Sequence, residues 1–173
     1  MIYMVDHVYT DRATEPEWHA WYAEYLKKLV AVPGIHTAQR FKALEPGPSR
    51  FLAMYSVDSA DVYSSAAYKE MGGGGSQSTQ FHPAYALWTR NLFDGAAQAP
   101  LVEPGQRVVV WDASAPDDRH ADAVWLKAVG LHMTTPYRAF KVLDRDAKYD
   151  VPGSHVYEPF TAPLLAVPDE EPQ

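Results

Sequence analysis

The stretch Glu17–Lys42, EWHAWYAEYLKKLVAVPGIHTAQRFK, decides the fold of this chain. Its first half carries large apolar side chains at spacings of three and four, the period of a helix with one buried face. Pro33-Gly34 ends the helix, because proline cannot continue it. Residues 35–43 then read as a strand. The stripe of the helix consists of Trp18, Trp21, Tyr22, Tyr25, Leu26, Leu29 and Val30.

Further strands and one more helix surround this unit. Residues 60–71 predict a second helix, which the glycine run 72–75 ends. The order over residues 1–95 is then β-α-β-β-α-β, a ferredoxin-like repeat with both helices on one face of an antiparallel sheet. The runs rich in β-branched and aromatic residues that predict the strands are 2–9, 35–43, 50–57 and 84–93.

The second half predicts a degenerate repeat of the first. Residues 96–106 are small and proline-bearing and indicate a linker. Residues 107–165 give the order β-α-β-β, with a helix over 117–131, and residues 166–173 form an acidic tail. We therefore expect an α+β fold in which two sheets pack as one barrel-like unit. Because the second repeat lacks a fourth strand, one edge should stay open, and a homodimer should cover it.

Three segments of the first half resemble the dimeric α+β-barrel superfamily, and within it the EthD-like proteins. They are residues 17–42, FLAMYSVDS at 51–59 and WTRNLFD at 88–94. The resemblance implies a (pseudo-)dimeric barrel of two four-stranded sheets, with the ligand between sheet and helices of one repeat. Members of the superfamily include cofactor-free monooxygenases, isomerases, cyclases and haem-degrading enzymes. EthD-like proteins often carry a histidine late in the first helix; here that region is Glu24–Lys28 (EYLKK), so its role does not carry over.

Composition narrows the possible partners and the compartment. The chain has 173 residues, with 15 basic against 22 acidic side chains and a net charge of -7. This balance argues against a nucleic acid or an anionic membrane as partner. The chain has no Cys and no apolar run of bilayer length, and its N-terminus does not look like a signal peptide. We expect a cytoplasmic protein whose partner is a small-molecule substrate.

His7 is the first candidate for chemistry. It lies within the first predicted strand and shares a face with Tyr3, Val5 and Tyr9. An imidazole among phenols and apolar groups can titrate near neutral pH and serve as general acid or base. The alternative is a structural histidine that hydrogen-bonds to a tyrosine.

Three more residues are catalytic candidates. His36 and Arg40 share a face of the second strand, where Arg40 could bind an oxyanion while His36 moves a proton. His82 follows the glycine run on a predicted loop, a usual place for site residues. The alternatives are a solvated strand face and a solvated loop. The glycine run itself lacks the Gly-Lys-Ser/Thr of a phosphate loop and reads as a mobile lid.

Aromatic side chains provide candidate ligand contacts. Tyr3, Trp18, Tyr22, Tyr85 and Trp88 could wall a cavity for a flat ligand, although aromatic stripes more often fill a core. The seven histidines are scattered and no His-Glu-x-x-His occurs, so we expect neither a metal nor an organic cofactor.

These features favour a cofactor-free acid/base enzyme, of lyase, isomerase or cyclase type, acting on a small aromatic or unsaturated carbonyl compound. Two alternatives stay open. One is a cofactor-independent monooxygenase of the same fold, in which the substrate itself is the reductant. The other is a non-catalytic module that binds a small ligand, with the aromatic stripe as pure core.

Overall fold

The computed structural model describes residues 1–167, which form nine antiparallel strands. Eight of them follow one another in the order β3-β1-β4-β6-β7-β5-β8-β2 and close into a barrel, because β2 also pairs with β3. The short β9 pairs with β2 on the same edge as β8, nearer the start of β2. The strands are β1 (Ile2–Tyr9), β2 (Ile35–Ala43), β3 (Ser49–Val57), β4 (Tyr85–Asp94), β5 (Gln106–Ala113), β6 (Val124–Leu131), β7 (Tyr137–Asp144), β8 (His155–Pro159) and β9 (Leu164–Leu165).

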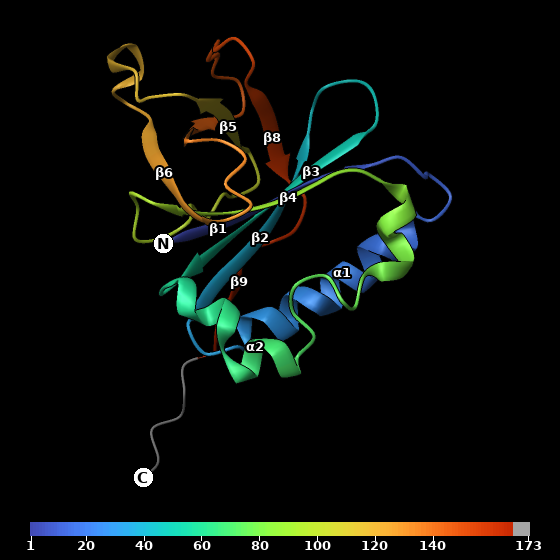
Figure 1. The fold of residues 1–173 in the computed structure, drawn as a ribbon. Coiled ribbons are helices and arrows are strands. Elements are labelled where there is room, and N and C mark those ends of the chain that lie inside the picture. The colour runs from blue at the N-terminus through green and yellow to red at the C-terminus, as the bar shows by residue number, and fades with distance from the viewer. Residues whose placement is uncertain (168–173) are drawn as a thin grey trace.

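The elements of the first half fall where the sequence predicts them. Helix α1 (Glu15–Val30) lies on the outside of the barrel against the first-half strands, as Figure 1 shows. The second predicted helix is broken into a 3-10 turn (Ala60–Ser64) and the short α2 (Ala66–Glu70). Ser65 between them has an extended backbone, and its hydroxyl accepts a hydrogen bond from the amide of Tyr68. This cap starts α2 as a separate helix.

The helix predicted over 117–131 is wrong. After a 3-10 turn at Asp118–His120 the chain enters β6, so residues 96–167 contain no counterpart of α1. In β6, Leu126 and Ala128 are buried inside the barrel while Trp125 packs on its outer face, which is the two-residue period of a strand. The prediction of an open sheet edge is also wrong, because β8 pairs with β2 and closes the barrel.

The barrel separates two main cores. Its interior is filled by apolar side chains from both halves, and Val102 of segment 96–106 is among them, fully buried. Near one end of the interior lies an ion network: Arg138 donates to Asp6 at 2.7 Å and to Asp112 at 2.7 Å. The second core is outside, between α1 and the sheet, and is largely aromatic.

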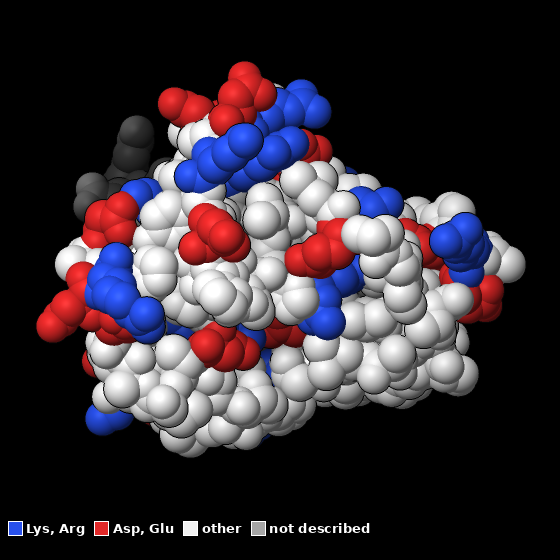
Figure 2. Space-filling view, turned by 90° about the horizontal axis from the view of Figure 1, so that it is seen from above, with Lys and Arg blue, Asp and Glu red and all other residues white. Residues whose placement is uncertain are grey.

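Charged side chains are mixed on the molecular surface. On the face in Figure 2, Lys and Arg side chains lie beside Asp and Glu, and neither sign covers it alone. None of the helices in residues 1–167 has the length and apolar character that crossing a membrane requires. The acidic tail expected over 166–173 lies, from residue 168 on, outside the described residues.

Candidate functional site

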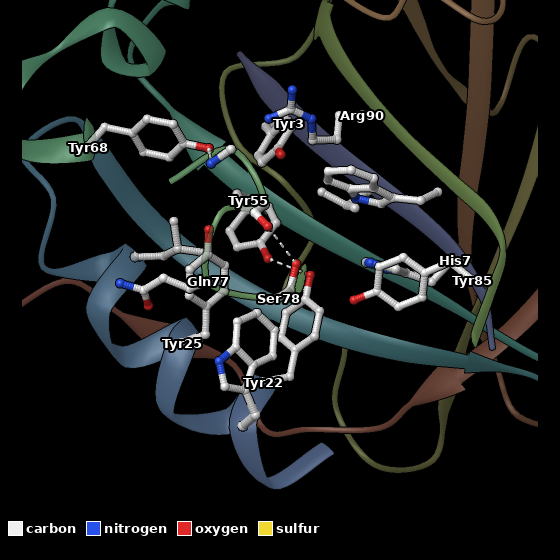
Figure 3. Close-up of a pocket in the computed structure, with 16 residues that line it drawn as sticks. Tyr3, His7, Tyr22, Tyr25, Tyr55, Tyr68, Gln77, Ser78, Tyr85 and Arg90 are labelled. Atoms are coloured by element: carbon white, nitrogen blue, oxygen red, sulfur yellow. Dashed lines mark hydrogen bonds between the residues drawn. The ribbon is translucent and has the colours of Figure 1, made fainter. Parts of the chain in front are cut away.

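A cavity lies between α1, the outer face of the first-half sheet and the loop that follows α2 (Figure 3). Its free space for the centre of a water molecule is about 30 Å³, room for about two waters. Aromatic rings dominate its walls. The lining residues are Tyr3, Val5, His7, Trp21, Tyr22, Tyr25, Leu29, Tyr55, Tyr68, Gly74, Gly75, Gln77, Ser78, Tyr85, Trp88 and Arg90.

The glycine run closes this cavity by direct contact with aromatic rings. A Cβ added to Gly73 would meet the Tyr68 ring at 2.3 Å, and one added to Gly75 would meet Trp88 at 2.4 Å. The amide of Gly74 donates to the Tyr68 hydroxyl at 2.9 Å. Glycine allows this close approach, so the loop packs directly on two of the aromatic side chains that line the cavity.

His7 projects from β1 into the cavity wall. It is 4% exposed, and its ring lies edge-on to those of Trp18, Tyr22 and Tyr85, with centroids 5.0 to 5.7 Å apart. Burial, followed by the positive charges of Arg40 and His82, holds its pKa well below 6.5. His7 is therefore neutral at pH 7 and has a lone pair with which to accept a proton.

Tyr85 offers a hydroxyl proton beside His7. The indole N–H of Trp18 donates to the Tyr85 oxygen at 3.0 Å. Since that oxygen accepts from the indole, its own O–H can act as a donor, and the side chain of Ser78 also lies within hydrogen-bonding range of it. Burial raises the pKa of Tyr85 to about 12, so the phenol keeps its proton at neutral pH.

A pair of tyrosines, Tyr22 and Tyr55, also lines the cavity. The hydroxyls of Tyr22 and Tyr55 are 3.2 Å apart and share one hydrogen bond, which leaves one of their two protons for a ligand. Burial raises the pKa of both phenols. The cavity thus combines one neutral base with several neutral O–H donors, a set suited to moving a proton and holding an oxyanion.

Arg40 does not line the cavity but lies behind Tyr22. Its guanidinium carbon is 4.0 Å from the centroid of the Tyr22 ring. Nη1 donates to Nδ1 of His19 at 3.2 Å, so the other nitrogen of His19 carries the hydrogen and donates to Glu15 at 3.2 Å. Burial and then Arg40 lower the pKa of His19 to about 4. Arg40 therefore acts on the site through its charge and its support of Tyr22.

The other sequence-predicted residues take different places. Trp18 is fully buried behind the wall, stacked on Tyr9, with centroids 4.4 Å apart. His82 stands behind Ser78, to which its Nε2 is hydrogen-bonded at 2.9 Å. His36 is not brought to the site: a register shift between Ile35 and Thr37 turns it to solvent. There it contacts Asp58 at 2.6 Å.

Tyr3, Tyr22, Tyr85 and Trp88 do line the cavity, but other lining residues were not predicted, among them Tyr25, Tyr55, Tyr68 and Arg90. Tyr25 belongs to the helical stripe that was assigned to the core. Tyr55 and Arg90 follow the two-residue period of their strands, which would have placed Arg90 on the face of Trp88. Tyr68 gave no signal, because its helix is too short to show a period. Residues 1–167 hold no group of three His, Asp or Glu side chains that could bind a metal ion.

Comparison with known proteins identifies a similar fold and no family. No family model matches the sequence, and no curated protein matches it either. A solved structure with a similar fold is the crystal structure of an anthrone oxidase-like protein. The match covers 95% of this chain and 93% of that chain, with a TM-score of 0.55 and 12% sequence identity. At that identity the likeness concerns the α+β fold with its closed antiparallel barrel.

Proposed function

We propose that this chain is a cofactor-free acid/base enzyme that acts on a small aromatic or unsaturated carbonyl compound. The observation that carries the proposal is the buried, neutral His7 in the wall of a cavity lined by aromatic rings and phenol hydroxyls. A structural histidine in a core would be expected to use its ring nitrogens in hydrogen bonds. Neither nitrogen of His7 forms one with another described residue, and only burial and the charges of Arg40 and His82 shift its pKa.

The proposed step is proton transfer next to a carbonyl. A ring nitrogen of His7 accepts the proton of the C–H bond, and the electron pair of that bond moves into an enolate. The enolate oxygen accepts a hydrogen bond from Tyr85, whose O–H the Trp18 indole leaves free. Return of the proton to another carbon gives an isomer, and expulsion of a leaving group gives a lyase reaction. A phenol donor held in place in a buried site stabilises the oxyanion more than bulk water would.

A second candidate is a monooxygenase without a cofactor, and the similarity in fold to an anthrone oxidase-like protein favours it. The same base would first form the enolate. One atom of molecular oxygen would then replace the two hydrogens of a CH₂ group next to the carbonyl. The other oxygen atom would leave as water, and the substrate would supply the electrons. Both candidates depend on His7, and the mass of the product distinguishes them.

Incubation of the protein with a pool of aromatic carbonyl compounds, followed by mass spectrometry, tests the proposal. An isomerase changes no mass, whereas the oxygenase replaces two hydrogens by one oxygen and consumes O₂. His7→Gln should lower turnover about 10²–10⁴-fold. The control is His155→Gln, on β8 at the surface, which should keep the wild-type rate. Full activity of His7→Gln would contradict the role of His7, and absence of any product would favour the ligand-binding module.

The pH profile adds a second readout. Since a general base must be unprotonated, the rate should rise with pH through the pKa of His7 and then level off. That pKa is lowered well below 6.5, so the rate should already be on its plateau at pH 6.5. A rate that still rises between pH 6 and pH 7, as for an ordinary histidine, would point to a different base.

Assembly, location and finer classification remain proposals as well. The order β1-α1-β2-β3-α2-β4 supports a ferredoxin-like and EthD-like assignment of residues 1–95. A homodimer is still proposed, although the open edge that suggested it is closed by β8. Light scattering should give twice the chain mass of 19.3 kDa, and the mass of one chain would contradict the dimer. A cytoplasmic location is likewise proposed, from composition.

A further inference from the structure

The cavity carries one ionised side chain, and it is a cation. No Asp or Glu is among the residues that line it. Its phenols stay protonated, because burial raises the pKa of Tyr3, Tyr22, Tyr25 and Tyr55. Arg90 is therefore the only formal charge on the wall. This is notable in a chain whose net charge is -7, in which carboxylates outnumber basic groups.

Arg90 has a hydrogen-bond donor that no described acceptor uses. It follows Trp88 by two residues on β4, and its guanidinium carbon is 5.4 Å from the centroid of the Trp88 ring. Its Nε is buried and has no hydrogen-bond partner. The arginines that form ion pairs within the described residues are others, namely Arg107, Arg119, Arg138 and Arg145. A buried N–H without an acceptor is costly, so it marks a place where a ligand can supply one.

A second unpaired donor lies near Arg90. The hydroxyl of Tyr63 is also buried without a partner. The Tyr63 ring packs on Tyr3, with centroids 4.7 Å apart, and lies within range of the charge of Arg90. Tyr63 is not among the residues that line the cavity, so the unsatisfied donor on the wall is that of Arg90, and a donor on a cation is the complement of an anionic acceptor. Figure 3 shows Arg90 beside Tyr3, away from the end of the cavity formed by His7 and Tyr85.

We propose that the cavity selects an aromatic substrate with a carboxylate, which Arg90 binds while the ring lies among the tyrosines. The inference rests on the proposed function and deepens it by naming the substrate class. Arg40, behind Tyr22, adds positive charge from the same side of the sheet. A carboxylate matches the planar fork of a guanidinium with two parallel hydrogen bonds, whereas a neutral carbonyl offers one acceptor and no charge.

The strand register puts His7 and Arg90 at separate points of the cavity wall. In the pairing of β1 with β4, His7 lies opposite Trp88 and Val5 lies opposite Arg90. Arg90 is therefore the diagonal neighbour of His7 on the cavity face, with Cα atoms about 7–8 Å apart along the sheet. A ligand that meets both side chains does so at two different places on its outline. The carboxylate and the reacting C–H are thus expected at different positions on the substrate.

The test uses two probes of equal shape, 4-hydroxybenzoate and its neutral amide 4-hydroxybenzamide, with affinity measured by calorimetry. The wild-type protein should bind the carboxylate about 10–100-fold more tightly, as expected for hydrogen bonds to a charged group. Arg90→Gln should abolish this preference and leave the affinity for the amide unchanged. Arg107→Gln is the matched control, because Arg107 pairs with Glu158 on the other half of the barrel, and it should keep the full preference.

Each outcome is decisive. Equal affinities in the wild type, or a preference that survives in Arg90→Gln, would overturn the inference and leave the proposed acid/base function standing. Failure of both probes to bind would contradict the aromatic-ligand proposal together with it. If Arg90→Gln does not fold, the Arg90→Lys variant replaces it. A lysine keeps the charge but cannot form two parallel hydrogen bonds, so the preference for the carboxylate should become smaller without disappearing. An unchanged preference in that variant would also count against Arg90.

Discussion

The imidazole of His7 meets the ring of Tyr85 edge-on, with the two centroids 5.0 Å apart. The two residues come from the neighbouring strands β1 and β4, and Trp18 of α1 fixes the Tyr85 hydroxyl from behind. A base and a hydroxyl donor are thereby held in one wall by three elements. This arrangement requires the helix, the strands and their register to be correct together.

Truncation of Trp18 should therefore destabilise the protein strongly. Its side chain is fully buried, stacks on Tyr9 and bonds to Tyr85. Trp18→Ala is expected to cost about 3–5 kcal/mol of unfolding free energy, the range for a large aromatic residue replaced in a core. Urea unfolding measures it. A loss below about 1 kcal/mol would show that the indole is not part of the packed core.

The ion network inside the barrel gives a second prediction. Arg138 and Asp6 have side chains only 6% and 8% exposed, so removal of the arginine leaves a buried carboxylate without its partner. Arg138→Met should cost about 3–5 kcal/mol. The matched control is Arg119→Met, whose side chain is 85% exposed and whose solvated pair with Asp117 should contribute little to stability. Equal losses in the two variants would refute the structural role of Arg138.

The contact between the glycine run 72–75 and Trp88 gives a third prediction. Gly75 has a φ of +91° and would bring a Cβ within 2.4 Å of Trp88, whereas Gly153 has a φ of +77° and nothing within 4 Å. Both alanine variants carry the cost of the left-handed backbone, so their difference isolates the contact. Gly75→Ala should be less stable than Gly153→Ala by about 1–3 kcal/mol. No difference in urea unfolding would mean that the loop does not pack on Trp88 in solution.

The first half of the fold is predictable from sequence because its signals are local. The stripe of α1 is long enough to show its period, and Pro33-Gly34 marks its end without ambiguity. Residues 117–131 mislead because Asp117 resembles a helix cap and because the apolar run 124–129 is too short to separate the two periods. Closure of the barrel is a contact between distant segments, β8 and β2, and no local pattern announces it.

The candidate site likewise combines residues that the local sequence predicts with residues that depend on the tertiary structure. His7 and Tyr3 are found from their shared strand face, since alternation alone fixes the side of a sheet, whereas Tyr85 and Trp88 were chosen only as aromatic residues. His36 is misplaced because the irregular pairing at Ile35–Thr37 shifts it off that face, and such bulges leave no mark in the sequence. Arg40 is buried against α1 and covered by Tyr22, so it is neither the predicted cavity residue nor solvated, and this outcome depends on side-chain packing.

The pKa of His7 provides the sharpest test of whether this histidine is a neutral base in the wall of the cavity. Histidine resonances followed by NMR from pH 4 to pH 8, with His7→Gln to assign the signal, give the value without a known substrate. Burial lowers the pKa, so the His7 ring should stay neutral far below pH 6.5. A titration midpoint near 6.5, the value of a solvated histidine, would contradict the account.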